Sequence, residues 1–133
     1  MKKLFLTASF AFVAVQLTGC VQAPTKTEVA NADYGTPISQ QDAEQEAHTF
    51  MHAYLKDPDS ATWECHQVHT AWQQDDAMDG GKRTYGYKLG CMINSKNSFG
   101  GYTGAKPYGF LYRDGKLVAA YYFHPGGGTE KIL

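Results

Sequence analysis

Five histidines are the side chains of this sequence best suited to metal binding or to acid–base chemistry near neutral pH. His48 and His52 are four residues apart, a spacing that places both on one face of a helix. Thr49 follows His48, so the glutamate of the helical zinc-protease motif is missing. His66 and His69 have opposite parity on an expected strand and point to different faces of it. We therefore expect no metal site, no cofactor and no catalytic residue; the alternative function is an enzyme, or a small-ligand or metal-binding protein, that uses His48, His52 or His66.

Cys65 and Cys91 form an even pair, which is expected to be oxidised in a protein exported from the cytoplasm. If residues 62–72 and 84–94 form a hairpin, its centre lies near residue 78, and the midpoint of the two cysteines is the same residue. The two side chains would then face each other on neighbouring strands, close enough for a bridge. We predict a structural disulfide; a redox-active or metal-binding thiol pair is the alternative, although no Cys-x-x-Cys spacing is present.

The stretch from Asn94 to Gly104 combines polar residues with two aromatic residues and three glycines. Glycines permit tight turns, and Phe99 and Tyr102 could offer apolar area to a partner. The alternative is a structural connection whose aromatic side chains fold back onto the sheet. The candidate binding residues of this loop are Asn94, Lys96, Asn97, Phe99 and Tyr102.

The first twenty residues resemble a lipoprotein signal peptide. Lys2 and Lys3 precede an apolar run from Leu4 to Val15, which is shorter than the roughly 20 residues that span a bilayer. Leu17-Thr18-Gly19-Cys20 then resembles the lipobox of type II signal peptides. The resemblance implies cleavage before Cys20 and attachment of acyl chains such as palmitate to its sulfur. An ordinary secretory signal and an uncleaved membrane helix are the alternatives.

The rest of the chain divides by composition. Residue 21 is Val rather than Asp, which by analogy with lipoprotein sorting favours the outer membrane. Val21 to Pro37 is polar, contains two prolines and has no periodicity, so we expect a flexible tether. The predicted organisation is a signal peptide at 1–19, the lipidated Cys20 with its tether at 20–38, a globular domain at 39–125 and a loose glycine-rich tail at 126–133.

The domain opens with a predicted amphipathic helix. Ser39 is suited to the N-cap, Asp42 lies in the first turn, and Asp57-Pro58-Asp59 ends the helix. Apolar residues recur at helical spacing between these limits. The stripe consists of Ala43, Ala47, Phe50, Met51, Tyr54 and Leu55.

Strand patterns follow the helix. Residues 108–113 and 116–123 flank Asp114-Gly115, which predicts a two-residue hairpin turn. With residues 62–72 and 84–94, this makes four strands. One face of the last hairpin, expected to hold Tyr108, Phe110, Tyr112, Leu117, Ala119 and Tyr121, must either pack on the helix or form an exposed patch. We therefore predict an α+β fold, with one N-terminal amphipathic helix on a four-stranded antiparallel sheet braced by the disulfide.

The net charge of the chain and its resemblance to a group of lipoproteins both restrict the kind of partner to be expected. The net charge is −1 and no Lys/Arg cluster occurs, which argues against nucleic acid. The lipobox, Leu55–Ala61 after the helix and Asn94–Gly104 before the hairpin together resemble a group of small uncharacterised bacterial lipoproteins and related envelope proteins. The resemblance covers roughly residues 47–118 and implies neither an activity nor site residues. We expect a non-enzymatic lipoprotein on the periplasmic face of the outer membrane, binding an envelope protein or cell-wall component through its sheet and the Asn94–Gly104 loop.

Overall fold

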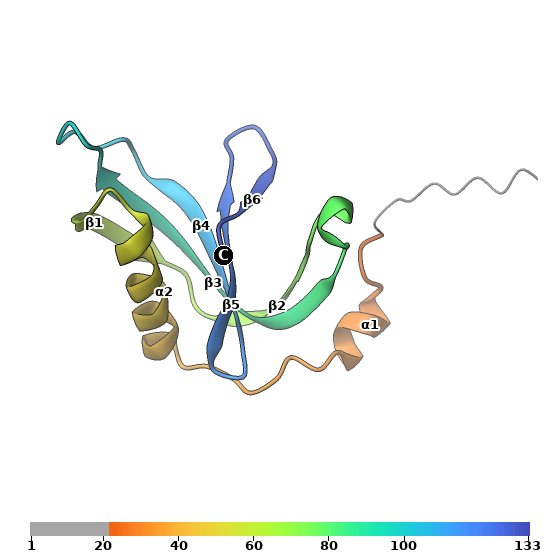
Figure 1. The fold of residues 1–133 in the computed structure, drawn as a ribbon. Coiled ribbons are helices and arrows are strands. Elements are labelled where there is room, and N and C mark those ends of the chain that lie inside the picture. Colours follow the sequence, from red (N-terminus) through yellow and green to blue (C-terminus); the bar gives the residue numbers. More distant parts are fainter. Residues whose placement is uncertain (1–21) are drawn as a thin grey trace, which may run out of the picture.

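The computed structural model describes residues 22–133, so the predicted signal peptide and Cys20 lie outside the described residues. Two α-helices and a six-stranded antiparallel sheet make up this part of the chain (Figure 1). Within residues 22–133, no helix has the length and apolarity needed to cross a bilayer. The elements are α1 (Lys26–Asn31), α2 (Gln40–Tyr54), β1 (Asp57–Cys65), β2 (His69–Gln74), β3 (Arg83–Lys96), β4 (Lys106–Arg113), β5 (Lys116–Phe123) and β6 (Thr129–Lys131).

Helix α2 occupies the segment where the apolar stripe predicts a helix. The side chain of Ser39 accepts a hydrogen bond from the amide of Asp42 at 3.1 Å, which caps the N-terminus. Its buried face consists of Ala43, Ala47 and Met51, all with no exposed area. This face packs on one side of the sheet, over residues of β3, β4 and β5.

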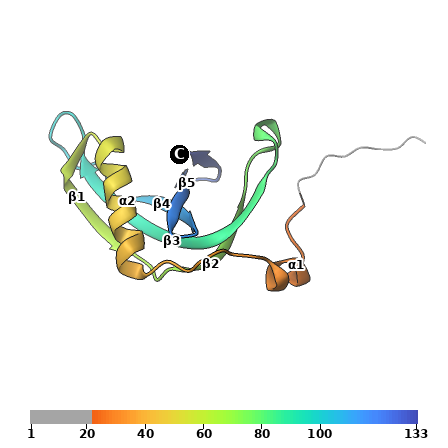
Figure 2. The same ribbon diagram turned by 60° about the horizontal axis from the view of Figure 1, so that its bottom comes forward.

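The predicted fold class is wrong: the chain is mostly β, with six strands where four were expected and a second helix, α1. One additional strand arises because the predicted strand 62–72 is two strands. Both β1 and β2 pair with the long, curved β3, but their registers differ by one residue, as Cys65 lies opposite Cys91 and His69 opposite Lys88. Residues 66–68 therefore face only two residues of β3, and the strand breaks there. Figure 2 shows β3 running the length of the molecule, with β1 and β2 beside its two halves.

The other additional strand comes from the expected glycine-rich tail. The three glycines after Pro125 have positive φ angles and turn the chain back, so that the amide of His124 donates to the carbonyl of Gly128 at 3.1 Å. Thr129–Lys131 then pairs with the end of β5. Composition alone indicated mobility here, whereas the glycines form a turn that returns β6 to the sheet.

The last hairpin has the predicted turn but a different division of its faces. Asp114 and Gly115 both have positive φ angles, as a two-residue hairpin turn of this kind requires. The register shifts between Leu111 and Tyr112, because Val118 is an extra residue on β5. Ala119 and Tyr121 consequently lie with Leu111 on the face away from α2, contrary to expectation.

The aromatic side chains of β4 lie under the helix. Tyr108, Phe110 and Tyr112 are at most 6% exposed and belong to the same core as α2. This part of the sheet therefore offers no exposed aromatic patch. A partner would have to meet the protein elsewhere.

The predicted disulfide is confirmed. Cys65 and Cys91 are bonded and lie directly opposite each other on β1 and β3, with 4.1 Å between their Cα atoms. Cys91 is 3% exposed and belongs to the core under α2. The bridge thus fastens the edge strand β1 to the central strand.

Candidate functional site

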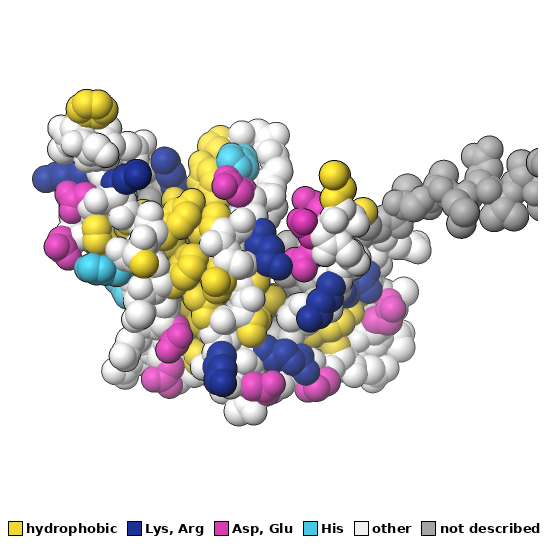
Figure 3. Space-filling view, in the orientation of Figure 1, with side chains coloured by type: hydrophobic (Ala, Val, Ile, Leu, Met, Phe, Trp, Pro, Cys, Tyr) yellow, Lys and Arg dark blue, Asp and Glu magenta, His cyan; other side chains and the backbone are white. Residues whose placement is uncertain are grey.

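The loop after β3 is shaped by Asn97. Its side-chain oxygen accepts hydrogen bonds from the amides of Phe99 at 2.9 Å and Gly101 at 3.2 Å. Its backbone carbonyl accepts from the amide of Gly100 at 3.0 Å, and Gly100 has a φ angle of 78°, which favours glycine. These bonds hold Phe99 at the tip of the loop with 96% of its surface exposed. The hydrophobic tip of the loop stands out at the upper left of Figure 3.

Tyr102 fixes the base of the same loop. Its hydroxyl donates to the carbonyl of Ser60 at 3.0 Å, and its backbone forms a bridge with Lys96. The ammonium of Lys96 lies 5.4 Å from the centre of the Tyr102 ring, within the range of a cation–π contact. Tyr102 therefore folds back onto β1, as the structural alternative expected, while Phe99 projects into solvent.

A groove of about 390 Å³ lies between this loop and the C-terminal end of α2. Three lysines and no acidic residue line it, although the protein as a whole is slightly acidic. Within the part of the chain that the structure describes, Lys56, Lys96 and Lys106 form no ion pair. The complete lining is Tyr54, Leu55, Lys56, Ile93, Ser95, Lys96, Asn97, Thr103, Lys106 and Tyr108.

The two tyrosines of the groove remain neutral at physiological pH. Burial raises the pKa of Tyr108 to about 12, helped by the neighbouring Tyr54. Burial also raises the pKa of Tyr54 above its ordinary value. Their rings meet edge to face with 6.3 Å between centroids. The groove thus has neutral aromatic walls and a positive charge supplied by its lysines, a combination suited to an anionic group.

Of the five predicted loop residues, Lys96 and Asn97 line the groove, Phe99 forms the tip and Tyr102 forms the base. Asn94 lies apart from them. It borders a separate hollow of about 250 Å³ together with residues of β1, and its backbone carbonyl accepts from the hydroxyl of Thr62 at 3.4 Å. Its side-chain oxygen is buried and has no hydrogen-bond partner among the described residues.

Sequence reasoning missed the groove residues that lie outside the loop. Lys56 follows α2, Lys106 begins β4, and Tyr54 and Tyr108 belong to α2 and β4. The lysine that follows the predicted helix was a visible signal, but only the packing of α2 on the sheet brings that helix end next to the loop.

The histidines of the alternative function each contact another group. The ring of His48 stacks on Trp63 with 3.8 Å between centroids. His52 lies 3.7 Å from a carboxylate oxygen of Asp59, at the surface. The amide of His66 donates to the carbonyl of Gly90 at the break between β1 and β2. Among residues 22–133, no three His, Cys, Asp or Glu side chains are grouped so as to hold a metal ion.

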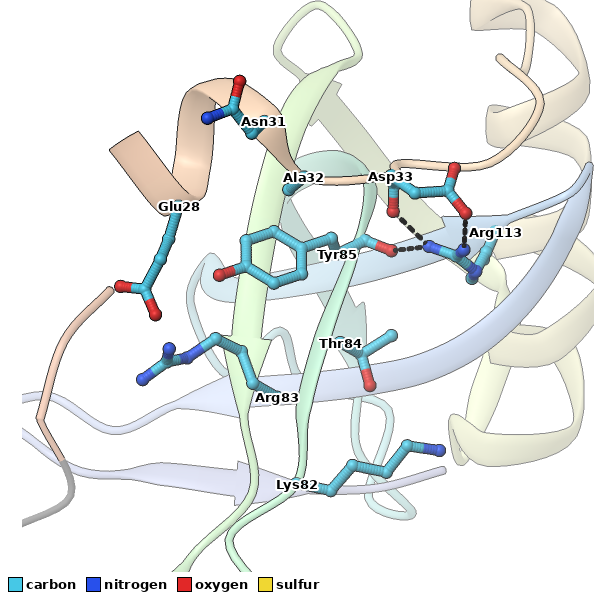
Figure 4. A pocket seen from close by; sticks show the side chains of 9 residues that line it. All are labelled: Glu28, Asn31, Ala32, Asp33, Lys82, Arg83, Thr84, Tyr85 and Arg113. Atoms are coloured by element: carbon cyan, nitrogen blue, oxygen red, sulfur yellow. Dashed lines mark hydrogen bonds and ion pairs between the residues drawn. The ribbon is translucent and has the colours of Figure 1, made fainter. Parts of the chain in front are cut away.

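A larger groove of about 700 Å³ lies between α1 and the start of β3 (Figure 4). Of its five charged side chains, all except Lys82 are bonded to the protein itself. Arg113 donates to the carbonyl and the carboxylate of Asp33, both at 2.6 Å, and to the carbonyl of Tyr85 at 2.9 Å. Glu28 accepts from the amide of Thr25 at 2.6 Å in the cap of α1. These bonds hold the N-terminal segment against the sheet, and the two arginines of the groove, Arg83 and Arg113, are both engaged by the protein itself.

No protein-family model, curated protein or solved structure matches the chain. The function therefore has to be inferred from the chemistry of the Asn94–Gly104 loop and of the lysine groove beside it. These two features are adjacent and share four residues, Ser95, Lys96, Asn97 and Thr103.

Proposed function

We propose that the protein is an envelope lipoprotein, anchored through acyl chains on Cys20 to the periplasmic face of the outer membrane, that binds another envelope macromolecule. The binding face consists of the Asn94–Gly104 loop and the lysine groove. The observation that carries the proposal is the position of Phe99, which is 96% exposed on a loop ordered by Asn97. The base of this loop borders a groove whose lining includes three lysines and no acidic residue.

An exposed phenylalanine on an ordered loop is suited to anchoring a partner. Burial of such a side chain contributes about 1.5–3 kcal/mol. Because the hydrogen bonds of Asn97 already order the loop, binding costs less conformational entropy than it would for a mobile segment. Aromatic side chains of this kind dominate the energetics of many protein interfaces.

The lysines define the charge of the partner. Lys56, Lys96 and Lys106 favour a negatively charged surface and raise the rate of encounter with it. A purely anionic polymer would satisfy the lysines but would leave Phe99 exposed. The favoured partner is therefore an envelope protein with an apolar pocket beside acidic residues, and an anionic cell-wall polymer is the competing outcome of the test.

Photo-crosslinking in living bacteria tests the proposal. A photoreactive amino acid replaces Phe99 at the loop tip or, as the control, Gln45 on the exposed face of α2. We expect a discrete adduct from position 99 alone, and mass spectrometry of the adduct identifies the protein. A folded, lipidated protein that gives no protein adduct at position 99 would contradict a protein partner.

A charge variant tests the groove separately. We expect K56Q/K96Q/K106Q to reduce the yield of the position-99 adduct at least about fivefold, because the electrostatic attraction is lost. The matched variant K26Q/K116Q/K131Q removes the same charge from other exposed parts of the surface and should leave the yield unchanged. Equal yields from both variants would show that the groove takes no part in binding.

A further inference from the structure

The segment that precedes α2 is fastened to the sheet from its first described residue. The guanidinium of Arg83, at the start of β3, donates to the carbonyl oxygen of Gln22. Three residues further on, Thr25 and Glu28 exchange hydrogen bonds in a capping box that starts α1. The beginning of this segment is therefore held at the N-terminal end of β3.

The same segment is held again after α1. Asp33 forms an ion pair with Arg113 at 2.6 Å (Figure 4). The ring of Tyr34 packs edge to face on Tyr85 with 5.7 Å between centroids. The amide of Thr36 then donates to the carboxylate of Asp114 at 2.9 Å. Residues 22–36, expected to be a flexible tether, thus form a strap along the sheet.

The strap determines where a lipid on Cys20 would lie. Only residue 21 separates Cys20 from Gln22, and two residues of extended chain span at most about 7 Å. An acyl chain on Cys20 would therefore begin next to Arg83. The turn that joins β2 to β3, residues 75–82, is at the same end of the sheet; in Figures 1 and 2 it lies near the start of the described chain.

We propose that this turn is a membrane-contact surface whose Met78 enters the interface of the phospholipid bilayer; the inference rests on the lipid anchor of the proposed function. Met78 is the tip of the turn, within the short 3₁₀ helix Ala77–Asp79, and is 99% exposed. A flexible, apolar thioether chain fits the boundary between headgroups and acyl chains.

The charges of the turn fit a largely zwitterionic surface. Lys82 and Arg83 at its base would lie close to lipid phosphates, whereas Asp76 and Asp79 would face the ammonium groups of phosphatidylethanolamine; the third acidic residue, Asp75, is paired with Lys131. Because both signs are present, charge alone gives little attraction. The anchor on Cys20 supplies the affinity, and the strap directs the turn to the bilayer.

The strap also places the proposed membrane-contact turn far from the proposed partner-binding face. Arg83 is the first and Lys96 the last residue of β3, a strand of 14 residues with a contour length of about 45 Å. The anchor therefore lies at one end of this strand, and the lysine groove with its loop lies at the other. A partner can reach the loop without displacing the Met78 turn.

Fluorescence quenching tests the orientation. The lipidated, disulfide-bonded protein is reconstituted into vesicles of phosphatidylethanolamine and phosphatidylglycerol that carry bromine near the glycerol end of the acyl chains. A fluorescent amino acid replaces Met78 or, as the control, Lys116 in the β4–β5 turn. We expect at least about threefold stronger quenching at position 78 than at position 116. Equal quenching at the two positions, or none at position 78 while the protein floats with the vesicles, would overturn the inference.

A strap variant tests the cause of the orientation. R83A/D33A removes the side-chain bond to Gln22 and the carboxylate bond to Arg113, so we expect quenching at position 78 to fall at least about twofold while flotation with vesicles is unchanged. Unchanged quenching would overturn the role of the strap. Mass spectrometry of the N-terminus distinguishes the two proposals: acyl chains on Cys20 without quenching contradict only the Met78 contact, whereas a protein without acyl chains contradicts the anchor and, with it, this inference.

Discussion

The hydroxyl of Tyr112 donates a 2.6 Å hydrogen bond to the carbonyl oxygen of Ala43, joining β4 to α2 inside the core. Neither residue has any exposed surface. Burial raises the pKa of Tyr112 far above its ordinary value, and the nearby Glu46 and Glu44 add to the effect. The bond links residues 69 positions apart and helps to set where the helix rests on the sheet.

Removing this hydroxyl should destabilise the domain. We expect Y112F to lower the free energy of unfolding by about 1–2 kcal/mol, because a buried hydrogen bond is lost without a water to replace it. Urea denaturation measures the change. Y54F is the control, since Tyr54 is 42% exposed, and should cost less than about 0.5 kcal/mol. Equal losses for the two variants would show that the bond to Ala43 contributes nothing.

Two glycines of β3 should respond differently to alanine. A Cβ atom at Gly86 would lie 2.2 Å from the backbone oxygen of Tyr112, whereas one at Gly90 would meet nothing closer than 3.8 Å. We therefore expect G86A to lower the free energy of unfolding by about 2–3 kcal/mol or more, because the backbone has to shift. G90A should cost less than about 1 kcal/mol. Thermal unfolding compares them, and similar melting temperatures would contradict the close approach of β3 and β4 at Gly86.

The disulfide should supply a large share of the stability. Cys65 and Cys91 are 26 positions apart, and a loop of this length predicts about 3 kcal/mol of stabilisation by restriction of the unfolded chain. Denaturation of the oxidised and the reduced protein should differ by this amount. The C65A/C91A variant should have a stability close to that of the reduced protein and should not respond to reductant. A reduced protein as stable as the oxidised one would refute the prediction.

The strap should loosen in acid. The hydrogen bond from the amide of Gly35, together with the positive charge of Arg113, holds the pKa of Asp33 below its ordinary value of 3.8. Since the folded state lowers this pKa, the contribution of the carboxylate is complete above pH 3.8 and is lost as the pH falls through the lower folded value. NMR titration should therefore give a midpoint for Asp33 below 3.8, and amide exchange at Gly35 should accelerate below that midpoint.

A variant of Arg113 tests whether this arginine contributes to the lowered pKa of Asp33. R113Q should raise the midpoint of Asp33 towards 3.8 without abolishing the whole shift, because the bond from Gly35 remains. A midpoint of 3.8 or above in the unsubstituted protein would contradict the strap contact.

Local sequence patterns were sufficient to predict several structural elements. The apolar stripe and Ser39 locate α2, and Asp114-Gly115 locates the last hairpin turn, because each depends on hydrogen bonds and periodicity within a few residues. The disulfide was also predictable, because β1 and β2 pair with β3 in registers that differ by only one residue, so a single hairpin centred near residue 78 places Cys65 opposite Cys91. The unusual composition of Asn94–Gly104 indicated the loop, and its residues Asn97 and Phe99 form its turn and tip.

Tertiary structure decided the rest. The break between β1 and β2 and the return of β6 change the sheet from four strands to six. The extra residue Val118 changes which side chains share a face of the last hairpin. Each of these features depends on pairing between strands. The lysine groove exists because the packing of α2 beside the loop brings Lys56 to Lys96, and the pairing of β4 with β3 brings Lys106 there. The strap exists because Arg83 and Arg113 meet Gln22 and Asp33 across the fold. Periodicity specifies which face of a segment is apolar, but the contacts between faces form only when segments far apart in sequence pack together.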